Sequence, residues 1–195
     1  MTDKDRTELQ FWIDWFNSYD EAGYRESRMN CYNRVLSYLP ELKDEPGLGL
    51  DLGCGLVSMF ENTGLNMVAI DPLLEEYQKV HLPPESNVRY VPGHRDDGII
   101  QFPDDNFDFI ACINVIDHTE RWRSLLREIR RVLKPGGKLY FMVNFDPFLT
   151  PPHHVMIWNY DTVRNEMPFF MLKGVIDWVE CYSKYQFWGR FSNEA

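Results

Sequence analysis

The chain lacks the cysteine spacing of a zinc site or a disulfide framework. Its four cysteines, Cys31, Cys54, Cys112 and Cys181, are scattered, and no Cys-x-x-Cys pair or Cys/His cluster occurs. A structural zinc needs closely spaced ligands, so we expect no metal site. Cys54 and Cys112 stand in apolar stretches, where a free thiol behaves as a small hydrophobic group. The cysteines therefore favour a reducing compartment.

Long apolar runs and an excess of positive charge are also missing. No run approaches the ~20 residues of a membrane span, and residues 1–8 lack the apolar core of a signal peptide. We therefore expect a cytoplasmic protein without a membrane partner. The 20 Lys and Arg against 30 Asp and Glu give a formal net charge of -10. This charge would repel DNA or RNA, so we expect no nucleic-acid partner.

Strand-like and helix-like segments alternate through the middle of the chain. Apolar runs predict five strands, at residues 48–52, 66–71, 88–91, 107–115 and 138–145. Helices are predicted between them, at residues 58–63, after Pro72 and at 122–133. This alternation predicts a parallel sheet with helices on both faces.

The two ends of the chain follow a different pattern. Helical spacing of apolar residues predicts two helices, at 7–18 and 25–39, before the first strand, with a break at Gly23. Near the other end, a short helix is predicted from Asp161 as its N-cap. Residues 175–181 and 185–191 then predict an antiparallel hairpin. A chain of 195 residues suits one domain with a sizeable core.

A glycine turn follows the first predicted strand, in the stretch Leu50-Asp-Leu-Gly-Cys-Gly55. Glycine permits a positive φ and leaves no Cβ between the backbone and a ligand. At the carboxyl edge of a parallel sheet, such a turn is where open α/β folds bind nucleotide-like ligands. The second predicted strand ends at Asp71. For the glycines alone, a tight turn without a ligand is the alternative interpretation.

Four motifs in order resemble those of the class I S-adenosylmethionine-dependent methyltransferases, in particular the small-molecule, type 11-like branch. Residues 50–55 are similar to the first motif of that family and Asp71 to the acid after its second strand. Residues 106–118 resemble its fourth strand and following loop, and 133–139 its turn into the fifth strand. The resemblance implies a Rossmann-like, doubly wound, seven-stranded sheet, mostly parallel with the last strand antiparallel, and S-adenosylmethionine as cofactor.

The resemblance also implies how the chain is organised. Residues 1–195 would form a single methyltransferase domain. Its parts would be an N-terminal helical cap at 1–46, a cofactor-binding core at 47–146, and a substrate-side loop, helix and hairpin at 147–195. Val57 stands where the family often has a third glycine, and His94, Asp96 or Asp97 would face adenine. The cofactor-binding residues implied are Asp51, Gly53, Cys54, Gly55, Asp71, Pro72, His94, Asp96, Asp97 and Asn114.

Methyl transfer from such a donor needs no metal, because the methyl group is already activated. The protein mainly aligns the two reactants and excludes water. Methylation of a hydroxyl group also needs a base that takes up the hydroxyl proton, and histidine is the usual choice. His118 follows the fourth predicted strand, and His153 and His154 follow the fifth. These three are the candidate catalytic residues, although a structural or surface histidine is the alternative for each.

The expected function is methyl transfer to a small-molecule acceptor, at a hydroxyl. Two alternatives stay open. A non-catalytic S-adenosylmethionine-binding protein could keep the same motifs. A nicotinamide-dependent oxidoreductase also uses a glycine turn and a following acid, but its third glycine would fall at Ser58. The sequence leaves the oligomeric state open.

Overall fold

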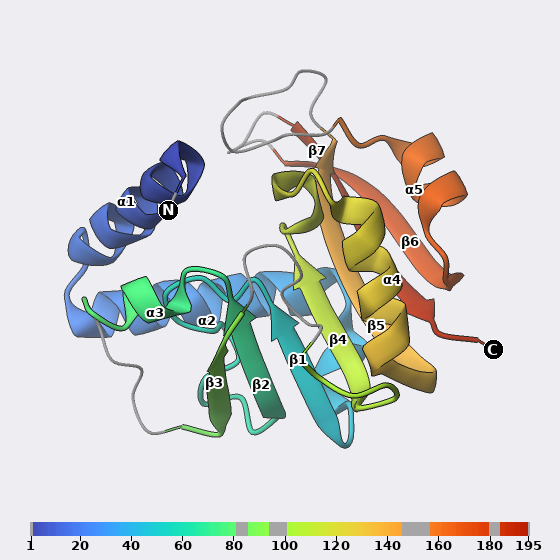
Figure 1. The fold of residues 1–195 in the computed structure, drawn as a ribbon, viewed down its shortest axis with the longest axis horizontal. Helices are drawn as coiled ribbons and strands as arrows, with labels where there is room; N and C mark the ends of the chain where they lie inside the picture. The colour runs from blue at the N-terminus through green and yellow to red at the C-terminus, as the bar shows by residue number, and fades with distance from the viewer. Residues whose placement is uncertain (1, 81–85, 94–100, 146–156, 180–183, 195) are drawn as a thin grey trace.

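A seven-stranded sheet forms the centre of the computed structural model, which describes residues 2–80, 86–93, 101–145, 157–179 and 184–194 (Figure 1). The strand order is β3-β2-β1-β4-β5-β7-β6. Neighbours among the first five strands in this order run parallel, whereas β7 is antiparallel to both β5 and β6. The predicted fold is therefore confirmed. The strands are β1 (Leu48–Leu52), β2 (Asn66–Asp71), β3 (Val88–Pro92), β4 (Phe107–Ile113), β5 (Leu133–Phe145), β6 (Phe170–Val179) and β7 (Lys184–Ser192).

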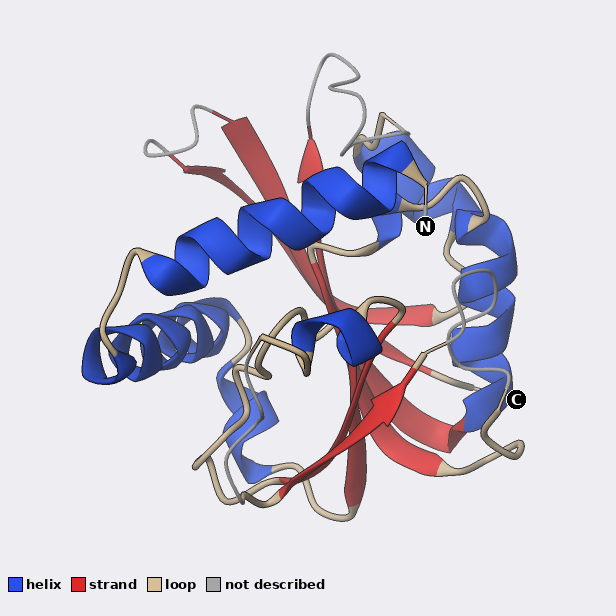
Figure 2. Ribbon diagram, turned by 60° about the vertical axis from the view of Figure 1, so that its left-hand side comes forward, coloured by secondary structure: helices blue, strands red, loops and turns tan. Residues whose placement is uncertain are grey.

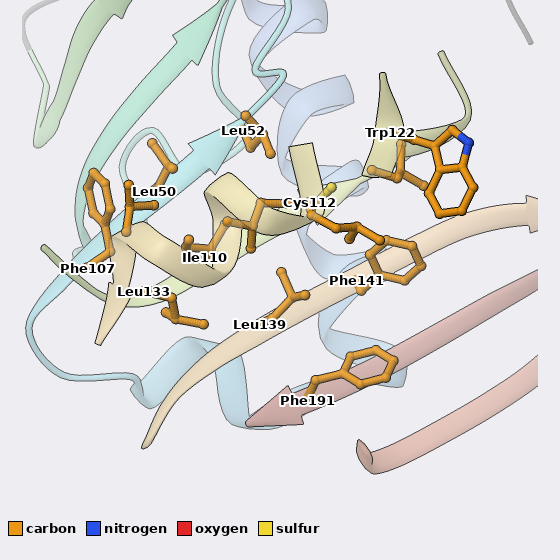
Figure 3. Close-up of a cluster of buried hydrophobic side chains, with 14 of the residues drawn as sticks. Leu50, Leu52, Phe107, Ile110, Cys112, Trp122, Leu133, Leu139, Phe141 and Phe191 are labelled. Carbon is orange, nitrogen blue, oxygen red and sulfur yellow. The ribbon is translucent and has the colours of Figure 1, made fainter. Parts of the chain in front are cut away.

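Helices cover both faces of this sheet. The helices are α1 (Asp3–Asn17), α2 (Glu21–Tyr38), α3 (Leu74–Tyr77), α4 (Trp122–Val132) and α5 (Tyr160–Glu166), with short 3-10 turns η1 (Pro40–Asp44) and η2 (Ile116–His118). The apolar stripe of α4 packs against one face, where it meets side chains such as Leu50, Ile110 and Phe141 (Figure 3). α2 packs against the opposite face through Tyr32 and Val35. The ends of β1 and β4 are thereby held between two apolar layers.

The two N-terminal helices begin at capping side chains. Thr2 accepts a hydrogen bond from the backbone N–H of Asp5, and Asp20 accepts one from Gly23. Both caps satisfy N–H groups that have no partner within the helix. The predicted break at Gly23 is wrong, because the cap at Asp20 places Gly23 in the first turn of α2.

Two other local predictions were wrong, and a third was correct only in part. Residues 58–63 form turns rather than a helix. In these turns, the Ser58 hydroxyl accepts a hydrogen bond from the Phe60 N–H, a local bond that competes with helix formation. The helix after Pro72 is reduced to the single turn of α3. The N-cap of α5 is Asn159, whose side chain accepts from the Thr162 N–H, so Asp161 lies inside the helix.

Helix α1 lies beyond the carboxyl ends of the parallel strands. Figure 1 shows it on the side to which the arrowhead of β1 points, and Figure 2 shows it as the long helix that begins next to the N label. It contacts α3. No residue of α1 is fully buried, yet its apolar side packs against a small cluster that includes Leu73 and Tyr77. In the part of the chain that the structure describes, no helix has the length and apolar character of a membrane span.

Candidate functional site

The glycine turn, Gly53–Gly55, follows β1 and is hydrogen-bonded to the end of β2. Gly53 and Gly55 have φ angles of 73° and 65°. The N–H groups of Gly53 and Cys54 donate to the carbonyl of Ile70, at 2.9 and 3.1 Å. A Cβ on Gly53 would lie 2.6 Å from a methyl group of Val115, so this position accepts no larger residue without a shift. The turn is therefore held tightly at the carboxyl edge of the sheet.

Asp71 braces this turn from the end of β2. Its Oδ2 accepts from the Gly55 N–H at 3.0 Å, and its Oδ1 accepts from the Leu73 N–H at 2.8 Å. The second bond is local and does not cap a helix, because α3 has its N-cap at Leu73 and no side-chain bond caps it. Burial raises the pKa of Asp71 to about 6, against the effect of these two bonds. Each carboxylate oxygen has capacity for a further hydrogen bond, so bracing and ligand binding are compatible.

Asp51 lies in β1 beneath the segment that follows the turn. Its side chain is buried, and its Oδ2 accepts from the Ser58 hydroxyl at 2.6 Å. Burial raises the pKa of Asp51 to about 6, partly opposed by Ser58 and by the charge of Arg28. The Ser58 hydroxyl is thus bound to a buried carboxylate, at the position where the oxidoreductase pattern requires glycine for close packing. This contact weighs against that alternative.

Two helices outside the sheet add residues to the site. Arg28 of α2 is 9 % exposed, and its guanidinium lies 5.8 Å from the ring of Trp12 and 5.9 Å from that of Trp15. Among the described residues, nothing accepts a hydrogen bond from its Nε. A Cβ on Gly55 would lie 3.1 Å from Trp12, so this indole of α1 covers the turn.

Arg28 was missed by the sequence analysis. The available signal was its spacing: it stands four residues from Tyr24 and four from Tyr32, on the face of α2 that is buried. A positive charge within such a stripe marks a residue that meets a partner inside the protein.

Asn114 follows β4, next to the turn. It adopts a φ of 59°, and its N–H donates to the carbonyl of Met142 at 3.0 Å. Its side chain is exposed, and its Oδ1 accepts a hydrogen bond from Asn144 of β5. The predicted site residues Asp51, Asp71 and Asn114 are thus gathered at the adjacent ends of β1, β2 and β4, as the strand order requires.

The predicted histidines have different outcomes. His118 lies in η2, and its Nε2 is 3.9 Å from Oδ1 of the buried Asp117. Lys4 of α1 donates to the carbonyl of His118, so the start of α1 reaches the loop after β4. The candidates His153 and His154 and the adenine candidates His94, Asp96 and Asp97 lie outside the described residues.

The remaining candidates around the turn have clear local environments. Cys54 is buried, and burial raises the pKa of its thiol well above the usual range, so it is present as an unreactive thiol. Pro72 is exposed and directly follows Asp71. A parallel sheet with a glycine turn after β1 and an acid after β2 defines a Rossmann-like ligand-binding domain.

Comparison with known proteins shows which proteins this domain is similar to. Residues 50–141 match the family described as the methyltransferase domain. This match covers just under half of the chain, and with the motifs described above it makes these residues similar to the class I S-adenosylmethionine-dependent methyltransferases. The chain is 30% identical to the thiol S-methyltransferase TMT1B of Homo sapiens over 101 residues, which are 47% of this chain and 40% of that protein.

Other similar proteins differ in their named activity. The ubiquinone/menaquinone biosynthesis C-methyltransferase UbiE of Shewanella frigidimarina is 37% identical over 76 residues, 39% of this chain and 28% of that enzyme. The matched regions span less than half the length of these two curated relatives. The structure of N-methyltransferase NodS from Bradyrhizobium japonicum, in complex with S-adenosyl-L-homocysteine, shares the fold with a TM-score of 0.65 and 19% identity. That comparison covers 99% of this chain and all of NodS.

Proposed function

We propose that this protein transfers a methyl group from S-adenosylmethionine to a hydroxyl of a small molecule. The main support for the proposal is the position of Asp71. Its carboxylate lies at the end of β2 and accepts a hydrogen bond from the N–H of Gly55 in the glycine turn. A ribose diol requires an acceptor of this kind beside a turn that leaves room for the rest of the cofactor. The sequence family supports the same cofactor.

The charges around the turn fit the two ends of an amino acid. The buried carboxylate of Asp51 would attract the ammonium group of the cofactor. The guanidinium of Arg28, with a buried Nε that no described residue engages, would bind the cofactor carboxylate. An unpartnered buried donor is costly, and a bound carboxylate would give the Nε of Arg28 the acceptor that the described residues do not supply. The adenine contact of His94, Asp96 or Asp97 stays a prediction.

Other residues would position the methyl acceptor and take up its proton. When bound, the cofactor supplies an activated methyl group, and the protein has to hold the acceptor in line and exclude water. Trp12 covers the glycine turn and would exclude water on the α1 side. His118 would accept the proton of a hydroxyl, with the buried carboxylate of Asp117 beside it to orient the imidazole. His153 and His154 stay as the other candidates for this role.

Calorimetry with S-adenosylhomocysteine tests the cofactor site directly. We expect binding in the low-micromolar range or tighter and a rise in Tm on binding. Asp71→Asn should weaken binding by about 1.5–3 kcal/mol, the scale of hydrogen bonds to a charged group. Asp161→Asn, an exposed acid in α5, is the matched control and should bind as the unmodified protein does.

Two outcomes would contradict the proposal. One is the absence of both heat and a Tm shift at millimolar S-adenosylhomocysteine. The other is tighter binding of NADH than of S-adenosylhomocysteine, because that result would favour the oxidoreductase alternative. A Tm measurement on Asp71→Asn without ligand separates loss of binding from loss of the fold.

A further inference from the structure

Four polar side chains form a hydrogen-bonded chain at the ends of β4, β5 and β7, which we name the amide relay: Arg34, Gln186, Asn144 and Asn114. Arg34 of α2 donates to Oε1 of Gln186 at 2.9 Å, and Nε2 of Gln186 donates to Oδ1 of Asn144 at 2.8 Å. Nδ2 of Asn144 then donates to Oδ1 of Asn114. Asn144 and Gln186 are direct partners in the register of β5 and β7, and both are buried.

Arg34 fixes the direction of this relay. A guanidinium has donors and no acceptor, so Gln186 has to turn its oxygen toward Arg34 and its NH2 group toward Asn144. Asn144 must then turn its oxygen toward Gln186 and its NH2 group toward Asn114. The order of the four side chains alone determines this arrangement. Asn114 therefore turns its oxygen inward and its NH2 group away from the relay.

Asn114 lies at the end of β4, beside the glycine turn. Asn114 directly follows β4, and its neighbour Val115 lies against Gly53 of the glycine turn. Its side chain is exposed, and none of the described residues accepts a hydrogen bond from its Nδ2. In the strand order, β4 lies between β1, which carries the turn, and β5, so Asn114 is on the side of the turn away from Asp71.

We infer that Asn114 recognises a hydrogen-bond-accepting oxygen of the methyl acceptor, such as a carboxylate, carbonyl or phenolate oxygen. Arg34, Gln186 and Asn144 are positioning residues that keep its NH2 group turned outward. An amine acceptor would meet this donor with N–H groups of its own, so the relay selects against amines. This inference rests on the proposed function and specifies the class of its substrate. The net charge of -10 would by itself favour a cationic ligand, so selection of an oxyanion requires a local group.

Two probes with the same ring and opposite hydrogen-bonding groups test this selection. Benzoate and benzylamine are titrated into 15N-labelled protein saturated with S-adenosylhomocysteine. The side-chain NH2 resonances of Asn114 are assigned by their loss in Asn114→Asp. We expect benzoate to shift these resonances and to bind tighter than benzylamine by about tenfold, which is close to the lower limit for a hydrogen bond to a charged group.

Two substitutions should reverse this preference by different routes. Asn114→Asp keeps the oxygen that accepts from Asn144 and replaces the outward NH2 group with an oxygen. In Gln186→Glu, the new carboxylate accepts hydrogen bonds from both Arg34 and Asn144. The amide of Asn144 therefore has to reverse, with its NH2 group toward residue 186 and its oxygen toward Asn114. Asn114 then donates to Asn144 and presents its own oxygen outward. A purely structural role of Gln186 would not produce this reversal. Asn62→Asp is the matched control, since Asn62 is exposed, also has a positive φ and lies in the turns before β2.

The binding preferences of the three variants support or overturn the inference. Reversed preference in both variants, with Asn62→Asp unchanged, supports it. Unreversed preference in Asn114→Asp overturns the contact with Asn114, and this variant suffices even where Gln186→Glu fails to fold. Reversal in Asn114→Asp but not in folded Gln186→Glu overturns the role of the relay. Failure of S-adenosylhomocysteine to bind the unmodified protein contradicts the proposed function instead, and calorimetry on each variant distinguishes the two failures.

Discussion

Neutralising Asp51 should stabilise the free protein at alkaline pH. The side chain is 2 % exposed, and burial raises its pKa from the usual 3.8 to about 6, although the Ser58 hydroxyl and the charge of Arg28 favour the ionised form. Asn has the same shape as Asp, and its oxygen can still accept from Ser58. Asp51→Asn therefore removes the buried charge while it keeps the hydrogen bond of 2.6 Å.

The sign of the effect follows from proton linkage. Between pH 3.8 and about 6, the folded protein binds more protons at Asp51 than the unfolded chain does. The free energy of unfolding therefore falls as pH rises through this window, by up to about 3 kcal/mol at higher pH. At pH 8 the full cost is present, and Asp51→Asn should recover up to ~3 kcal/mol. At pH 4 most of the cost is absent, and the substitution should change stability little.

Urea unfolding at pH 4 and pH 8 measures this difference on either side of the isoelectric point, which is about 4.9. Asp108→Asn is a control of opposite sign. The hydrogen bond from Lys134 lowers the pKa of Asp108, so its contribution to stability is present at pH 8 and is lost as pH falls through that lowered pKa. Asp108→Asn should destabilise the protein at pH 8. Equal losses of stability in Asp51→Asn at both pH values would refute the reasoning.

Two further substitutions test the catalytic proposal and the cover of the site. Once an acceptor is known, His118→Gln should lower turnover roughly 10²–10⁴-fold and leave the affinity for S-adenosylhomocysteine unchanged. The rate of the unmodified enzyme should rise with pH as the imidazole loses its proton. Near-normal turnover in His118→Gln would contradict the role of His118. Gly55→Ala should cost about 1–3 kcal/mol in urea unfolding, because its φ is 65° and the new Cβ would meet Trp12 at 3.1 Å. In a Trp12→Ala background this cost should be smaller, and strictly additive losses would show that the indole does not cover the turn.

Local patterns in the sequence were sufficient to predict the central sheet and the glycine turn. The apolar runs of β1, β2 and β4 are buried from both sides, and such runs are typical of parallel strands between two layers of helices. The turn needs glycine at Gly53 because Val115 packs against its Cα. The role of Asp71 as a site residue could be predicted because it is the last residue of an apolar strand. In each case the structural cause lies within a few residues of the signal.

Predictions failed where side chains decide between alternative local structures. The hydroxyl of Ser58 bonds to Asp51 and to the N–H of Phe60, and the segment forms turns although its composition suits a helix. The cap of α5 belongs to Asn159 rather than Asp161, two residues apart and both good capping residues. Such choices depend on contacts that helical spacing does not describe.

The residues that would select the acceptor depend on contacts between distant parts of the chain. Asn144 and Gln186 are separated by 42 residues and meet because β5 and β7 pair in one register. A shift of β7 by one residue would turn Gln186 to the opposite face of the sheet, where Arg34 of α2 could not reach it. The orientation of Asn114 would then lose its anchor, although the glycine turn and Asp71 would be unchanged. Under this proposal, binding of the cofactor and choice of the acceptor are separable: the first would depend on the parallel strands, and the second on the antiparallel strand β7.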